Sequence, residues 1–259
     1  MQPSAITSDG AEGDSQTFEY DDYGKVAEWD LLYNTDGSHV TASYTYPDDN
    51  TILVTSEDTS PDTQTYWTET IQLVNGRASN SEGTFIQTQN NVLMIKKTYR
   101  LAFEYDPGNH LTAVKHSEVV GIGDDLPADA WNKSWDWENY LIWENGNLKE
   151  YQDYQGNARV TTTIKCDYSD YDATYPVNLP ITIQSHHHTP LMMQGVFGSN
   201  SKKLVKSVSA FDRNNKPISE RRYVYELNSD KYVESYSEII PHYNDRYTST
   251  LYEVTWTPK

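Results

Sequence analysis

Residues 93–105, LMIKKTYRLAFEY, decide the fold class, because apolar and polar side chains alternate along them. Most odd positions in this stretch are apolar or aromatic, whereas Lys, Thr, Arg and Glu occupy even positions. A period of two is typical of a β-strand with one buried face. The same period recurs in 160–167 and 248–256. Since the sequence offers no crossover helices between these runs, the strands are predicted to be antiparallel.

Turn sequences separate the alternating runs. Asn-Gly and Asp-Gly pairs supply the positive φ angles that tight hairpins require. About nine such signals predict roughly 14–18 strands. The signals are Asp22–Gly24, Asp36-Gly37, Pro47–Asn50, Asn75-Gly76, Asp106–Asn109, Asn145–Asn147, Gln155–Asn157, Arg213–Asn215 and Asn228–Asp230. The predicted fold is one large antiparallel meander of hairpins that forms a curved sheet or a β-barrel, closed or partly open.

Three segments interrupt the period of two. Residues 1–16 lack aromatic side chains and are predicted to form a flexible N-terminal tail, ahead of a single β domain over 17–259. Residues 121–140 and 167–203 contain Pro and small residues without alternation. They are predicted to hold one or two short helices or long loops.

Composition excludes several classes of protein. Lys and Arg number 20 and Asp and Glu number 38, so the formal net charge of the 259 residues is 20 − 38 = −18. This excess of acid argues against nucleic acid as a partner. One Cys rules out an internal disulfide framework. The sequence contains no run of 18 apolar residues, so it predicts no transmembrane helix. We expect a chain that does not span a membrane.

The turns share a recurring unit of an aromatic residue, an acid, the turn and then an apolar residue. Phe18–Asp21 leads to Val26, and Phe103–Asp106 leads to Leu111 over the same interval. We interpret the acid as accepting hydrogen bonds from turn amides, while the apolar residue opens the return strand. This Tyr-Asp-x-x-Gly-x-Leu cadence resembles the YD repeats of RHS-type exported proteins.

The overall layout, including Tyr171–Leu179 as a connector between hairpin blocks, resembles secreted lipoproteins of gut-type Gram-negative bacteria. These carry a domain of unknown function with a porin-like fold. The resemblance implies an exported protein, located in the periplasm or held at the outer membrane or cell surface as a lipoprotein. A lipid-anchor Cys would then precede this sequence. The resemblance supplies no catalytic residues and no cofactor.

Two sets of residues are candidates for ligand binding. Trp131, Trp135, Trp137 and Trp143 are interleaved with acids and amides, as in surfaces that recognise sugars by stacking and hydrogen bonding. Their alternative role is to close one end of the sheet. Met192 and Met193 are predicted to line a cavity that takes a hydrophobic or lipid-like ligand.

A metal site is a weak candidate in the His186–His188 triplet. In an extended segment His186 and His188 share a face and offer imidazoles to Zn²⁺ or Ni²⁺, but no carboxylate or thiol lies within six residues. The triplet is therefore predicted to consist of solvated loop or strand residues, and no cofactor is expected.

Catalysis is not indicated. The sequence contains no Gly-x-Ser-x-Gly and no Gly-rich phosphate loop, and Cys166 lies on the apolar parity of its strand, as a small core residue would. We expect a non-enzymatic envelope protein that binds a hydrophobic or lipid-like ligand on its curved sheet. The alternatives are a glycan-binding surface protein that uses the Trp131–Trp143 cluster, and a purely structural hairpin-repeat protein.

Overall fold

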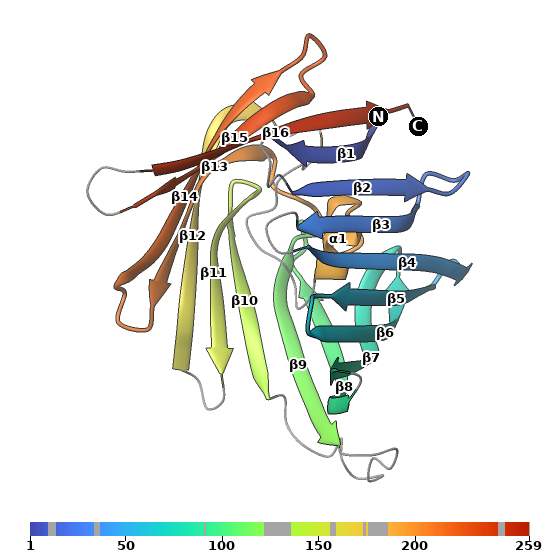
Figure 1. Cartoon of the computed structure of the whole chain (residues 1–259). Coiled ribbons are helices and arrows are strands. Elements are labelled where there is room, and N and C mark those ends of the chain that lie inside the picture. Colours follow the sequence, from blue (N-terminus) through green and yellow to red (C-terminus); the bar gives the residue numbers. More distant parts are fainter. Residues whose placement is uncertain are drawn as a thin grey trace.

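Consecutive strands pair in chain order around a complete circle. The structure, a computed structural model, describes residues 1–9, 14–33, 37–90, 92–121, 136–155, 159–172, 175, 186–242 and 247–258. Within these residues sixteen antiparallel strands form a closed barrel, whose seam joins β1 to β16. Both termini lie side by side at this seam (Figure 1). The predicted all-β antiparallel fold is confirmed, and the barrel is closed.

The elements of the barrel follow one another with few interruptions. The strands are β1 (Gln2–Ser8), β2 (Ser15–Tyr20), β3 (Val26–Tyr33), β4 (Ser38–Asp48), β5 (Thr51–Thr59), β6 (Thr63–Val74), β7 (Arg77–Gln89), β8 (Val92–Tyr105), β9 (Leu111–Gly121), β10 (Trp137–Glu144), β11 (Asn147–Gln155), β12 (Arg159–Asp172), β13 (Lys203–Asp212), β14 (Pro217–Leu227), β15 (Val233–Pro241) and β16 (Tyr247–Thr257). Between β12 and β13 lie a 3-10 turn, η1 (His186–His188), and a short helix, α1 (Thr189–Met193). Among the described residues, no helix has the length and apolar character needed to cross a bilayer.

The predicted flexible tail is wrong for its larger part. Residues 2–8 form β1, and β2 already begins at Ser15. Ile6 is buried opposite Val254 of β16. The chain orders here because β1 supplies backbone hydrogen bonds to both β2 and β16, whose edges would otherwise be unpaired. The composition of residues 1–16 does not reveal that the edges of β2 and β16 need a pairing strand.

The two predicted breaks are shorter than expected. The strand β10 starts at Trp137, within the first break, and β12 continues to Asp172, within the second. Both extensions are held by pairing with a neighbour: Trp137 lies opposite His116, and Asp172 lies opposite Lys203. Residues 122–135 lie outside the described part of the chain.

The side chains of each strand alternate between the barrel interior and its outer surface. On β6, Thr65, Glu69 and Ile71 are buried in the interior, while Gln64, Thr68 and Gln72 point outward. On β8 the outward parity carries Lys96, Thr98, Arg100 and Glu104. Cys166 is buried on the inward parity of β12, as predicted. The interior is thus rich in apolar and aromatic side chains, and the outer surface is largely polar.

The hairpin unit works as the sequence predicts. Asp21 accepts hydrogen bonds from the backbone N–H groups of Tyr23 and Lys25. Asp212 does the same for Asn214 and Lys216, and Asn228 for Asp230 and Tyr232. Three apolar residues that open return strands, Val26, Leu111 and Val233, are buried, whereas Ile218 after the Asp212 turn is 60% exposed. The side-chain oxygen at the start of each turn therefore fixes the turn geometry.

The residue three positions after the Asp or Asn that starts each of these turns has a positive φ. Gly24 has φ 75°, and Asn109, Asn215 and Lys231 occupy the matching place with φ 69°, 60° and 64°. A turn that lacks glycine therefore keeps the same conformation. Asn tolerates this left-handed conformation well, whereas for Lys it is costly.

Replacing Lys231 by Gly is expected to raise the free energy of unfolding by about 0.5–1 kcal/mol, because relief of the left-handed strain exceeds the entropy cost of glycine. Lys216→Gly is the matched control, since Lys216 lies in an equivalent exposed turn without a positive φ. It should be neutral or destabilising. Urea titrations of both variants measure the difference, and a loss of stability in Lys231→Gly contradicts the account.

Aromatic side chains brace the same end of the barrel. Tyr46 donates its hydroxyl hydrogen to the carbonyl oxygen of Val26 on the preceding strand, at 2.9 Å. Five further rings donate across a hairpin in the same way: Tyr20 to Pro3, Tyr105 to Ala78, Trp143 to Leu111, Tyr168 to Leu148 and Trp256 to Val233. Tyrosine makes up 21 of the 259 residues, and four of these tyrosines serve this repeated structural contact.

Tyr105→Phe is expected to lower the free energy of unfolding by about 1–2 kcal/mol, because the carbonyl of buried Ala78 loses the hydroxyl that lies 2.7 Å away. Tyr247→Phe provides the control, since this ring is 68% exposed. Chemical denaturation of both variants compares them. Equal stability of the two variants contradicts a structural role for the Tyr105 hydroxyl.

Candidate functional site

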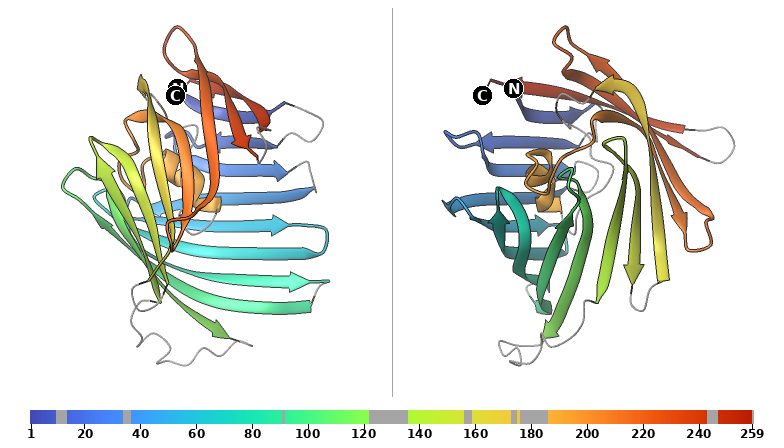
Figure 2. Two further views of the ribbon diagram at one scale, coloured as in Figure 1. Left: turned by 90° about the vertical axis from the view of Figure 1, so that its left-hand side faces the viewer. Right: turned by 180° about the vertical axis from the view of Figure 1, so that it is seen from behind.

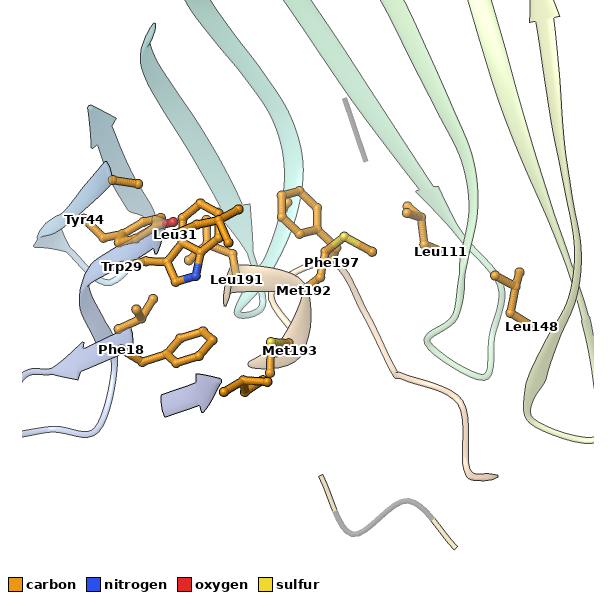
Figure 3. Packing of buried hydrophobic residues seen from close by; sticks show 14 of the residues in the cluster. Phe18, Trp29, Leu31, Tyr44, Leu111, Leu148, Leu191, Met192, Met193 and Phe197 are labelled. Carbon is orange, nitrogen blue, oxygen red and sulfur yellow. The ribbon is translucent and has the colours of Figure 1, made fainter. Parts of the chain in front are cut away.

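Residues 186–200, which we call the plug, lie inside the barrel. Two further views of the ribbon show α1 within the circle of strands (Figure 2). Leu191 is fully buried and joins the hydrophobic cluster of the barrel wall, near Trp29 and Leu31 (Figure 3). The Phe197 ring meets Phe103 of β8 edge to face, with centroids 5.1 Å apart. The plug therefore packs against the inner wall of the barrel.

Local sequence explains how the plug turns. Pro190 stands in the first turn of α1, where its missing N–H is tolerated and its fixed φ favours the helix. Gly195, with φ 80°, ends the helix in the left-handed conformation that favours glycine. The N–H of Val196 then bonds to the carbonyl oxygen of Leu191, which turns the chain back toward β13.

A buried cluster of Glu69, His187 and His188 joins the plug to the barrel wall. Glu69 points inward from β6, and the Nε2 atoms of His187 and His188 lie 2.9 and 2.8 Å from its Oε2 atom. The hydroxyl of Tyr99 on β8 donates to the same oxygen at 3.0 Å. All three side chains of the cluster are 0% exposed. His187 and His188 thus meet one oxygen atom of Glu69, although they follow it by 118 and 119 positions in the sequence.

A glycine makes room for this arrangement. Gly83 on β7 lies opposite both Glu69 and Tyr99 in the sheet. A Cβ atom at this position would lie 2.5 Å from the Tyr99 ring. The absent side chain lets the ring cross β7 and bring its hydroxyl to the carboxylate.

The surroundings of the cluster set its protonation. Burial alone raises the pKa of Glu69, but the two imidazoles outweigh it and hold the pKa well below its usual value. Burial lowers the pKa of His187. Each imidazole that donates to the carboxylate carries its hydrogen on Nε2. The Oε1 atom of Glu69 is buried and has no hydrogen-bond partner among the described residues.

A cavity of about 230 Å³ lies beside the plug, and we call it the lumenal cavity. His186, Thr189 and Met193 of the plug border it. Aromatic side chains form much of the remaining wall: Trp29, Tyr33, Tyr223, Tyr236 and Tyr252. The rings of Tyr236 and Tyr252 stack with centroids 4.8 Å apart and planes 13° apart.

Charged groups accompany these rings. Glu238 points into the lumenal cavity from β15 and accepts a hydrogen bond from Arg221 at 3.2 Å and one from Tyr223 at 3.1 Å. Asp14 also borders the cavity, which therefore combines flat apolar surfaces with two carboxylates, a guanidinium and several hydroxyl groups. Such walls suit a ligand that has both an apolar face and polar substituents.

A second cavity of about 340 Å³ opens at the barrel end that carries the Gly24 and Gly76 turns. Tyr46, Ile52 and Met193 contribute to its lining. Lys25 lies over the Tyr46 ring, with its Nζ atom 4.6 Å from the centroid. Met193 lines both this cavity and the lumenal cavity, so α1 borders both.

His116 forms another buried polar feature of the lumen. Its ring stacks on Trp137 at a centroid distance of 3.6 Å and lies 6.2 Å from the Tyr99 ring. His116 is fully buried, and this burial lowers its pKa to about 4. Asp136 opposes the shift and Lys97 adds to it.

The predicted tryptophan cluster does not gather in the described residues. Trp137 stacks on His116, whereas Trp143 stacks on His110 with centroids 4.6 Å apart, near the other end of β10. Trp131 and Trp135 lie outside the described residues. The two described rings thus serve separate contacts.

The other predicted residues are all in the plug. Met192 and Met193 are both buried, and Met193 also borders both cavities. The idea that His186 and His188 share a face is wrong, because the triplet forms a 3-10 turn rather than an extended segment. His186 borders the lumenal cavity, whereas His188 meets Glu69. The triplet is not a solvated loop, since His187 and His188 are buried.

Sequence reasoning missed the residues that build the buried cluster and the lumenal cavity, namely Glu69, Tyr99, His187, Arg221, Tyr223, Tyr236, Glu238 and Tyr252. One signal was available, because Glu69 lies on the same parity as Trp67 and Ile71. A carboxylate on the apolar face of a strand needs buried partners. The identity of those partners depends on how the plug folds back.

Comparison with known proteins places this architecture among solved structures. A porin-like protein from Bacteroides vulgatus aligns with a TM-score of 0.60 and 14% identity, covering 99% of each chain. A porin-like protein from Bacteroides uniformis aligns with a TM-score of 0.57 and 11% identity, covering 98% of this chain and 96% of the other. No family model and no curated protein matches the sequence. The porin-like fold is therefore shown, while kinship to YD-repeat proteins stays a prediction.

Proposed function

We propose that this protein is a non-enzymatic, exported protein of the cell envelope that binds a small amphipathic ligand in its lumenal cavity. The observation that carries the proposal is the lining of that cavity. Five aromatic side chains and the Arg221–Glu238 pair face one space inside a closed barrel. Rings bind the apolar face of a ligand, while the charged pair and the tyrosine hydroxyls bind its polar groups.

The outer surface supports an aqueous setting. A barrel embedded in a bilayer needs an apolar, lipid-facing band on its strands. Here the outward parity of β6 and β8 carries Gln, Thr, Lys, Arg and Glu side chains. Apolar side chains are also exposed, singly at Leu53 and Val224 and as a run over Val92–Met94 at the start of β8. The proposal therefore concerns a barrel that meets water on its outside and does not conduct through a membrane.

The size of the cavity favours a compact ligand over a long acyl chain. Leu191, Met192 and Phe197 belong to the buried hydrophobic cluster, so side chains of the plug already fill the space around them. The lumenal cavity measures about 230 Å³ and is lined by three charged residues, Asp14, Arg221 and Glu238. A saturated ring with hydroxyl groups, as in a sugar, or a short aromatic acid has the matching chemistry.

The proposal predicts that Tyr252→Ala weakens binding about tenfold, equivalent to about 1.4 kcal/mol, because the stacked wall of Tyr236 and Tyr252 is lost. Tyr247→Ala is the matched control, since this exposed ring comes from the same strand. Isothermal titration calorimetry with a panel of monosaccharides and disaccharides measures the affinities. A separate series with lauric acid tests the lipid-like alternative.

Native mass spectrometry of the purified protein first identifies any ligand that co-purifies. Binding of a sugar that depends on Tyr252 and not on Tyr247 supports the proposal. A co-purified acyl chain whose affinity is unaffected by Tyr252→Ala overturns the assignment to the lumenal cavity. Equal binding by both variants overturns it as well.

A further inference from the structure

The buried cluster has the composition of a metal site. It presents two imidazole nitrogens and one carboxylate, and the ligand atoms of Glu69, His187 and His188 all lie within 4.8 Å of one another. We propose that these three side chains bind one divalent transition-metal ion, best matched by Zn²⁺, which fastens the plug to the wall of the barrel.

The donor set selects the class of ion. Two imidazoles and one carboxylate are a common ligand set for Zn²⁺, and Fe²⁺ also uses it. Hard ions such as Mg²⁺ and Ca²⁺ prefer all-oxygen sites. Around Zn²⁺, with bonds of about 2.1 Å, neighbouring ligand atoms lie about 3.4 Å apart. The present separations of 2.8 and 2.9 Å need to widen only slightly to admit the ion.

A second observation points to the same place. Glu69 is entirely buried, yet its Oε1 atom has no hydrogen-bond partner among the described residues. A buried carboxylate oxygen without a partner is costly. An ion beside this carboxylate would engage its free lone pairs and balance its negative charge, since the ion-pair partners of Glu69 in the described residues are the two imidazoles.

The surroundings assign the ion a structural role. Tyr99 donates to the Glu69 carboxylate, which is the outer contact that commonly orients a ligating carboxylate. The cluster is closed to solvent, so a substrate has no route to it. An ion that enters during folding or during opening of the plug should dissociate slowly, because the plug must detach from β6 before the ion can leave.

The test begins with protein that has been unfolded in urea with EDTA and then refolded with or without one equivalent of ZnCl₂. After gel filtration, metal content is measured by inductively coupled plasma mass spectrometry. We expect about one Zn²⁺ per chain in the supplemented sample. At a free Zn²⁺ concentration 100-fold above Kd, the melting temperature should rise by about 5–10 °C.

The variants separate the cluster from its neighbour in sequence. His188→Gln should lose the bound Zn²⁺ and the thermal shift. His186→Gln should keep both, because His186 lies at the lumenal cavity rather than beside Glu69. Refolding wild-type protein with CoCl₂ gives a readout that needs no variant, since visible absorption bands of Co²⁺ report nitrogen and oxygen ligands in a site of low coordination number.

Two results overturn the proposal. One is wild-type protein that refolds but retains less than a tenth of an equivalent of Zn²⁺ and shows no Co²⁺ absorption bands. In that case the cluster is a hydrogen-bonded network alone. The other is loss of Zn²⁺ in His186→Gln to the same degree as in His188→Gln, which would place the ion elsewhere.

Discussion

Glu69→Ala will lower the free energy of unfolding by about 3–5 kcal/mol, the range for breaking a buried ionic pair by removing one partner. The substitution removes the acceptor that His187, His188 and Tyr99 share, and it leaves their donors buried without that acceptor. It also opens a cavity between β6 and the plug. The loss corresponds to a fall in melting temperature of about 6–20 °C for a chain of this size.

Glu82→Ala is the matched control for this prediction. Glu82 pairs with Arg100 at 3.5 Å on the outer surface, where its side chain is 59% exposed. Exposed pairs contribute between zero and about 1 kcal/mol. Urea unfolding in the presence of EDTA compares both variants without any contribution from metal. If Glu69→Ala costs no more than Glu82→Ala, the buried cluster does not anchor the plug.

Acid will destabilise the protein by about 3 kcal/mol through His116 between pH 6.5 and pH 4. Burial against Trp137 and Tyr99 disfavours the imidazolium and lowers the pKa of His116 to about 4. The unfolded chain regains the ordinary value of 6.5. Asp136 and Lys97 act on this ring in opposite senses, but burial is the largest cause.

The direction of the change in stability with pH follows from proton binding in the folded and unfolded states. Between pH 6.5 and 4 the unfolded chain binds a proton at His116, whereas the folded chain does not, so stability falls as the pH falls. The stabilisation is complete above pH 6.5 and is lost as the pH approaches 4. The lowered pKa values of His187 and Glu69 act in the same direction, so the informative quantity is a difference between variants.

His116→Gln is therefore expected to flatten the pH dependence by about 3 kcal/mol between pH 7 and pH 4. His242→Gln controls for a change of side chain alone, because His242 is exposed beside Thr248. Urea titrations at pH 7, 6, 5 and 4 give the four stabilities of each protein. Parallel curves for wild type and His116→Gln would contradict the burial of a neutral imidazole.

The sequence predicts the local part of the fold well, because each local signal acts over a few residues. The alternation in 93–105 marks β8, and Asp21 and Asp212 mark their turns by accepting bonds from amides two and four residues later. The conformation of the turn at Lys231 follows from the same unit even though glycine is missing. These contacts depend on sequence neighbours alone.

Closure of the barrel and the packing of the plug depend on distant residues, which explains why the sequence predicted a barrel and a short helix without deciding either point. The strand β1 is ordered by β16, about 250 residues away along the chain. Glu69 meets His187 and His188 only after 186–200 has folded into the lumen. The periodicity of a sequence does not predict contacts between residues so far apart along the chain. The inward parity of Glu69 signals that a partner exists, but it does not identify the partner.

Aromatic side chains and the plug lie inside the barrel, and the polar side chains of the outer surface lie in water. Hydrogen–deuterium exchange with mass spectrometry, performed on the full chain in detergent-free buffer, tests this claim most directly. We predict that amides of residues 191–198 exchange as slowly as those of β6 and β8, in a monodisperse sample. Rapid exchange of 191–198 beside protected strands, or a chain that stays dispersed only with detergent or lipid, would contradict it.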